Sequence, residues 1–188
     1  MSQPRSRKGP AARQLSQSGG RRSIVPEAEL RHTGLRILGS MPWGTHICVF
    51  YETKQDLLDV CVAFFEAGLE SNEFCVWAVS KPADEKEAMK ALRARVPQFD
   101  RRLAAEQIEI LKGYDWYLPA NEFDLQRITG GWNVKLESAL AKGFEGMRVS
   151  GNAFWLETKL WKEFREYEEE LDRTLAGRKM IVMCTYAL

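Results

Sequence analysis

The sequence of 188 residues has few of the side chains that build metal centres and redox sites. It contains only two histidines, His32 and His46, so no histidine cluster is visible. Four cysteines lie far apart in apolar segments, and no pair has C-x-x-C or metal-ligand spacing. They are Cys48, Cys61, Cys75 and Cys184. We therefore expect reduced, buried thiols, a structural hydrogen-bonding role for His46, and no bound metal or cofactor.

Acidic residues and long apolar runs are missing from residues 1–24, six of which are basic. Without an apolar run this segment is neither a secretory signal nor a membrane span. We interpret residues 1–33 as a disordered basic leader and residues 34–188 as one domain, with the cytoplasm as the expected location and no membrane contact. Six basic residues can contact nucleic acid nonspecifically but supply no base-reading element, which makes DNA binding a weak alternative.

Beyond residue 34, short apolar runs alternate with apolar stripes, which are segments whose apolar residues recur at the spacing of a helix. The runs predict buried strands at 46–51, 74–79, 108–111, 147–152 and 180–186. The stripes predict helices near 57–68, 89–103 (interrupted near Pro97), 128–140 and 160–175. Thr53 and Asp56 have the spacing of a capping box that starts the first helix. This alternation predicts a three-layer α/β domain in which helices cover both faces of a mostly parallel five-stranded sheet.

The loop after the first predicted strand has no glycine. A phosphate-binding loop needs glycines so that backbone N–H groups can surround the phosphates, followed by a Lys-Ser/Thr pair. The segment Tyr51–Asp56 instead carries Glu52 and Asp56, which repel a polyphosphate. No signature of a catalytic nucleophile such as G-x-S-x-G occurs elsewhere. We therefore expect a protein that is not an enzyme, with residual nucleotide binding at a non-standard site as an open alternative.

Ligands of open parallel sheets bind beyond the carboxyl ends of the strands. Aromatic walls with a few polar anchors suit a small organic molecule. The predicted ligand-binding residues are Tyr51, Glu52, Ser80, Asp115, Trp116, Tyr117, Ser150, Asn152 and Trp155. An equally good interpretation of Trp116 and Tyr117 is that they cover an exposed edge of the core.

We also make predictions for Gly151 and Arg148, two further residues of the fourth predicted strand. Gly151 has no side chain and therefore permits close approach by another group. Arg148, if it points inward, needs an acidic partner, for which Glu52 and Asp115 are candidates.

Four blocks of sequence together resemble the MEDS domain, the methanogen and methylotroph sensory domain named after a dichloromethane-responsive regulator. The blocks are Thr45–Glu52, Phe64–Phe74, Gly146–Leu156 and Met180–Tyr186. This resemblance covers roughly residues 35–187 and implies a RecA- or KaiC-like core that has lost its phosphate-binding loop. It also implies sensing of small hydrocarbon-type molecules, usually beside histidine kinase, PAS or DNA-binding modules.

The function expected from these observations is a stand-alone sensory domain for signal transduction or transcriptional regulation. No kinase, PAS or helix-turn-helix segment follows the fifth predicted strand, so output is expected through a signalling protein, through self-association or through the basic leader. The alternative is a protein-interaction module whose pocket is packed shut. In that case the predicted helix at 160–175 would present an apolar patch to the partner.

Overall fold

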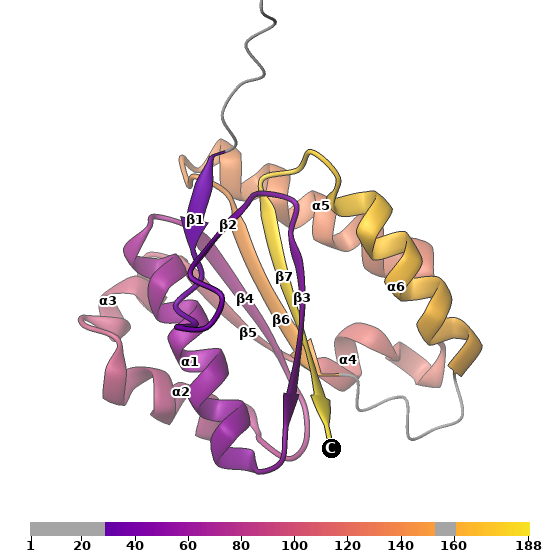
Figure 1. The fold of residues 1–188 in the computed structure, drawn as a ribbon, viewed down its shortest axis with the longest axis horizontal. Coiled ribbons are helices and arrows are strands. Elements are labelled where there is room, and N and C mark those ends of the chain that lie inside the picture. The colour runs from indigo at the N-terminus through magenta and orange to yellow at the C-terminus, as the bar shows by residue number, and fades with distance from the viewer. Residues whose placement is uncertain (1–28, 153–160) are drawn as a thin grey trace, which may run out of the picture.

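The computed structural model describes residues 29–152 and 161–188. Its centre is a five-stranded parallel sheet with strand order β3-β7-β6-β4-β5 (Figure 1). The strands are β3 (His46–Tyr51), β4 (Phe74–Val79), β5 (Ile108–Lys112), β6 (Met147–Asn152) and β7 (Met180–Ala187). Each one coincides with a predicted apolar run, which confirms the predicted fold class.

Helices cover both faces of this sheet and make it a three-layer domain. One face carries α1 (Lys54–Glu70), α2 (Glu85–Arg95) and α3 (Phe99–Ala104), and the other carries α5 (Leu125–Ala141) and α6 (Trp161–Leu175) (Figure 1). A short helix α4 (Gly113–Tyr117) and a 3-10 turn η1 (Pro119–Asn121) follow β5. No helix in residues 29–152 or 161–188 has both the length and the apolar character needed to cross a bilayer.

Successive side chains of each strand point to opposite faces of the sheet, which divides the hydrophobic core into two layers. On the α1 side, Phe65 packs on Trp77 with ring centroids 5.3 Å apart. On the α5 and α6 side, Trp132 and Leu171 are fully buried against Val149 and its neighbours. The strands are apolar on both faces because helices cover both, as expected of a parallel sheet.

The amino end of the described chain folds back on the sheet as a small hairpin. Its strands β1 (Leu30–His32) and β2 (Ser40–Pro42) pair in antiparallel fashion. Residues 30–32, which fall within the predicted leader 1–33, therefore form a strand of this hairpin. Three-residue strands are too short for a periodic pattern to reveal them.

Candidate functional site

The strand order creates one place in the sheet where neighbouring connections diverge. The helix that follows β4 in the chain, α2, covers one face of the sheet, and the helix that follows β6, α6, covers the other face (Figure 1). β4 and β6 are neighbours, and their pairing ends at Ala78 and Gly151. Ligands of open α/β sheets bind at such a topological switch point, outside the carboxyl ends of the strands.

Ser80 and Asn152 lie just beyond this last pair. The Asn152 side chain donates hydrogen bonds from Nδ2 to the carbonyl oxygens of Ser80 and Lys81, at 3.1 and 2.6 Å. Two other atoms of the same group, Ser80 Oγ and Asn152 Oδ1, are buried and have no hydrogen-bond partner among the described residues. Buried polar atoms without partners are rare because each one loses its hydration, so this pair needs an explanation.

Tyr117 lies on the opposite face of the same strand end. Its hydroxyl is placed so closely over Gly151 that a Cβ there would lie only 2.5 Å from the hydroxyl oxygen. The predicted close approach at Gly151 is therefore present, and Tyr117 makes it. The Tyr167 ring of α6 packs edge-on against Tyr117, with ring centroids 6.1 Å apart, and burial raises the pKa of both phenols. Tyr117 is thus a core residue that closes the α6 side of the switch point.

An open depression of about 380 Å³ lies at the end of β5. Trp116 forms its aromatic wall, and the lining residues are Glu85, Ile110, Leu111, Lys112, Asp115 and Trp116. The Trp116 ring also stacks on Trp132 at 4.3 Å, yet its buried Nε1 has no partner among the described residues. Trp116 therefore covers the core and faces the depression at the same time.

Gly113 connects the depression to the switch point. It is the residue after Lys112, and the Ser80 hydroxyl lies directly against its α-carbon. A side chain at this position would clash with Ser80 Oγ. Sequence reasoning missed Gly113, although a glycine directly after a strand was the available signal.

The other predicted site residues lie further away. Tyr51 is buried at the end of β3, two strands from β6, and Glu52 beyond it is exposed. Ser150 is fully buried, with its hydroxyl 3.7 Å from Cys61 Sγ under α1. Trp155 lies outside the described residues. The structure therefore gathers Ser80, Asn152, Trp116, Tyr117 and Asp115 around the β6, β4 and β5 ends.

The loop between β3 and α1 is closed by its own side chains. Thr53 Oγ1 accepts a hydrogen bond from the Asp56 N–H at 3.2 Å, and the Asp56 carboxylate accepts one from the Thr53 N–H at 2.8 Å. This is the predicted capping box. Hydrogen bonds from Thr53 lower the pKa of Asp56, so a negative charge stands where a phosphate would enter.

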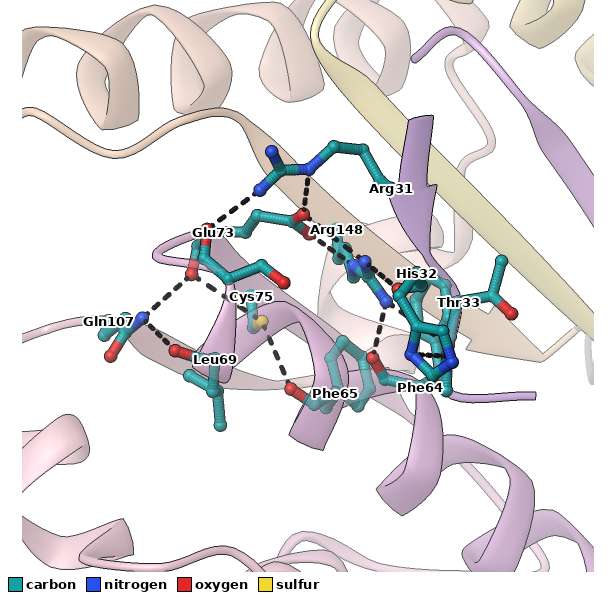
Figure 2. Close-up of polar contacts among 12 residues, drawn as sticks. Arg31, His32, Thr33, Phe64, Phe65, Leu69, Glu73, Cys75, Gln107 and Arg148 are labelled. Atoms are coloured by element: carbon teal, nitrogen blue, oxygen red, sulfur yellow. Dashed lines mark hydrogen bonds and ion pairs between the residues drawn. The ribbon is translucent and has the colours of Figure 1, made fainter. Parts of the chain in front are cut away.

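A second polar cluster lies at the amino ends of the strands, remote from the switch point. Arg148 points inward as expected, but its partner is Glu73 at the start of β4, and neither Glu52 nor Asp115 (Figure 2). Both side chains are fully buried. Arg148 is the second residue of β6, so its neighbours lie at the amino end of the sheet, whereas Glu52 and Asp115 follow the carboxyl ends.

The same cluster holds the amino-terminal hairpin in place. Arg148 donates to the carbonyl oxygens of His32 and Thr33, and Arg31 donates to Glu73 Oε1 at 2.8 Å (Figure 2). Every charge is paired and the carbonyls serve as additional acceptors, which is what a buried ion pair needs. This network is structural and leaves no group for a ligand.

Comparison with known proteins supplies one family and one similar fold. The family model described as MEDS, "MEthanogen/methylotroph, DcmR Sensory domain", matches residues 45–188. A crystal structure of a KaiC-like protein from the hyperthermophilic archaeon Pyrococcus horikoshii OT3 is similar, with a TM-score of 0.61 and 15% sequence identity. The match covers 86% of this chain and 73% of that one, and it shows the RecA-like fold alone. No curated protein matches the sequence.

Proposed function

The chain belongs to the MEDS family of sensory domains, and on that premise we propose that it binds a small, largely apolar molecule at the switch point between β4 and β6. The domain signals occupancy to a protein partner or to a second copy of itself and has no catalytic activity of its own. The observation that carries this proposal is the pair of buried atoms, Ser80 Oγ and Asn152 Oδ1, that lack partners among the described residues.

Those two atoms supply the polar anchor that orients a ligand. A buried hydroxyl or amide oxygen without a partner loses about 1–3 kcal/mol of hydration, which a ligand hydrogen bond can recover. A ligand that donates to Asn152 Oδ1 and either donates to or accepts from Ser80 Oγ satisfies both atoms. One polar group on a small molecule is sufficient for this.

The neighbouring depression supplies the apolar contact. Its volume of about 380 Å³ is at the small end of ligand-binding cavities, and its wall includes Trp116, Ile110 and Leu111. Lys112, Asp115 and Glu85 form a polar rim. A compact molecule with an apolar body and one polar group fits this combination better than a polyanion does.

Signalling requires that the ligand bind two conformations unequally. The switch point is suited to this because the segments leaving β4 and β6 lead to α2 and α6, on opposite faces of the sheet. A ligand held between Ser80 and Asn152 contacts the ends of both strands at once. A nearly complete change of population needs about 5.5 kcal/mol of differential affinity.

Two alternatives are less well supported. Nucleotide binding at the first loop is disfavoured because Thr53 and Asp56 already satisfy each other's backbone N–H groups. An interaction surface on α6 is disfavoured because Tyr167, Leu171 and Leu175 point into the core, and no large hydrophobic side chain is exposed on the described part of the helix, 165–175.

A thermal-shift screen of the full chain tests the proposal, with small, largely apolar compounds that carry one N–H or O–H group compared with halogenated compounds that carry none (dichloromethane among them) and with ATP and GTP. A ligand at about 100 times its dissociation constant should raise the unfolding free energy by roughly 2.7 kcal/mol. We expect stabilisation by a small, largely apolar compound with one polar group and none by the nucleotides.

Ser80→Ala then locates the binding. The variant removes a hydroxyl that makes no hydrogen bond among the described residues, so its stability should equal or exceed that of the wild type by about 1 kcal/mol. Its affinity for the compound should fall about tenfold, measured by calorimetry, for the loss of one hydrogen bond. The control is Ser138→Ala, which removes an exposed hydroxyl on α5. Stabilisation by ATP, or equal affinity in both variants and the wild type, would contradict the proposal.

A further inference from the structure

A cluster of metal-ligating side chains lies between the sheet and α6. His46 of β3, Cys184 of β7 and Glu168 of α6 direct one ligand atom each to a common point, and these atoms all lie within 4.8 Å of one another. His46 Nε2 is 3.2 Å from Cys184 Sγ and 3.5 Å from Glu168 Oε2. The sequence conceals the cluster, since His46 and Cys184 are 138 residues apart.

These separations match the edges of a tetrahedral zinc site. With the usual bond lengths to imidazole, thiolate and carboxylate, two ligand atoms of a tetrahedral Zn²⁺ ion are about 3.4–3.6 Å apart. The two separations from His46 Nε2 are close to these values, and all three ligand atoms lie within 4.8 Å of one another, so small side-chain movements bring them around one ion. Two of the three residues are fixed on adjacent strands, β3 and β7, so the geometry depends little on loops.

Neighbouring side chains orient two of the ligands. Asp172 Oδ1 lies 3.0 Å from His46 Nδ1, so an Nδ1–H that donates to it leaves Nε2 unprotonated and directed at the cluster. Tyr186 donates a hydrogen bond to Glu168 Oε1 at 3.1 Å, which leaves Oε2 for the ion. A carboxylate behind a ligating histidine is a common feature of zinc sites.

Cys48 lies on the strand next to Cys184 and is a candidate for a fourth ligand. It is paired directly with Cys184 across the β3–β7 ladder, so the two side chains are on the same face of the sheet. Unlike Cys184 it is exposed, at the open edge strand. The fourth position of the ion is therefore open to the Cys48 thiolate or to a solvent molecule, and either one gives four ligands.

We propose that His46, Glu168 and Cys184 bind a divalent metal ion of the zinc class, with Cys48 or solvent as the fourth ligand. Imidazole and thiolate select zinc over magnesium or calcium, which require oxygen ligands. The competing explanation is a metal-free hydrogen-bonded cluster in which His46 pairs with Asp172 and Glu168. This site is separate from the proposed ligand site, and neither proposal depends on the other.

Zinc titration of the full, metal-free chain in competition with a chromogenic chelator tests the proposal. We expect one Zn²⁺ ion per chain, with a dissociation constant of about 1 μM or lower. His46→Gln and Cys184→Ser should each weaken binding by about 100-fold or more, and Asp172→Asn by about tenfold, because Asp172 only orients the ligand. The control is His32→Gln, which removes the other histidine from the exposed hairpin and should leave affinity unchanged.

Cobalt substitution of the wild type provides evidence that does not depend on the variants folding. Co²⁺ bound to Cys184 should show a sulfur-to-metal charge-transfer band in the near ultraviolet and the visible spectrum of a tetrahedral site, and Zn²⁺ should abolish both. Absence of the thiolate band in the wild type would overturn the proposal. So would zinc affinity that is equal in the wild type, His46→Gln and Cys184→Ser.

Discussion

The polar side-chain atoms at the ends of β4 and β6 differ in whether they make hydrogen bonds. The Asn152 amide nitrogen donates two hydrogen bonds, while its oxygen and the Ser80 hydroxyl have none among the described residues. Thr185 on the neighbouring strand, by contrast, donates a hydrogen bond from Oγ1 to the Gly151 carbonyl oxygen. The contrast within one strand end is the reason that we assign the ligand site to these two residues.

The buried thiols and phenols lead us to predict how the stability of the fold changes at alkaline pH. Burial raises the pKa of Cys61 to about 12, from an ordinary value of 9.0, and also raises that of Tyr117. Above about pH 9 the unfolded chain therefore binds fewer protons than the folded chain, and the unfolding free energy falls as the pH rises. We expect a loss of up to about 1.4 kcal/mol per pH unit for each group that ionises only on unfolding.

Urea unfolding of the wild type and of Cys61→Ala between about pH 9 and pH 11 checks this expectation. The variant is less stable at neutral pH because it loses buried volume, but its stability should fall less steeply with pH. An equal slope for the two proteins would show that Cys61 ionises in the folded state.

Among the structural elements, the β1–β2 hairpin is held in place by the buried charges more than by the pairing of its own two strands. Two three-residue strands are marginal alone, and their attachment runs through Arg148, Glu73 and Arg31. The backbone carbonyls of His32 and Thr33 are acceptors for Arg148 (Figure 2). Loss of the arginine should therefore loosen the hairpin as well as destabilise the core.

Arg148→Met is expected to lower the unfolding free energy by about 3–5 kcal/mol, because it leaves the Glu73 carboxylate buried with one partner fewer. Urea unfolding measures the loss, and hydrogen exchange should show faster exchange of the β1–β2 amides. The matched control is Arg93→Met, whose pair with Asp100 is exposed and screened by solvent, so that its loss should cost far less stability. Equal losses in the two variants would contradict a structural role for the buried pair.

The elements that the sequence predicted correctly are those with a strong local signal. The five strands are continuous apolar runs, and α1 begins at the Thr53–Asp56 capping box as its spacing predicts. The interruption between α2 and α3 falls at Pro97, where the pattern placed it. The β1–β2 hairpin and the five-residue helix α4 were missed because neither is long enough for a periodic pattern.

Pairings between elements could not be predicted, because they depend on strand order. The partner of Arg148 is Glu73 only because β4 lies beside β6, and His46 meets Cys184 only because β3 lies beside β7. In the candidate site, the residues at the β4 and β6 ends were predicted from a general rule about parallel sheets. Among the residues lining the depression at the β5 end, Asp115 and Trp116 were also predicted, whereas Glu85, Ile110, Leu111 and Lys112 were not.

On the scale of the whole molecule, the two ends of the sheet have different roles. The amino ends are fixed by a fully paired network around Glu73 and Arg148, which is rigid because removing any member leaves a buried charge. The carboxyl ends of β4 and β6 carry polar atoms that have no partner within residues 29–152 and 161–188, and the end of β5 carries an open depression. This difference between the two ends suits a sensory domain. Because the amino end of the sheet is rigid, a conformational change at the carboxyl end is transmitted to the helices.

The central claim, that the ligand binds between β4 and β6, is tested most directly by two-dimensional ¹H–¹⁵N NMR of the 21.5 kDa chain with the compound that stabilises it best. We predict the largest shift changes at the backbone amides of Ser80, Gly113 and Asn152 and at the Asn152 side-chain amide. Changes centred on the Thr53–Asp56 loop or on the outer face of α6, with Ser80 and Asn152 unchanged, would contradict the account.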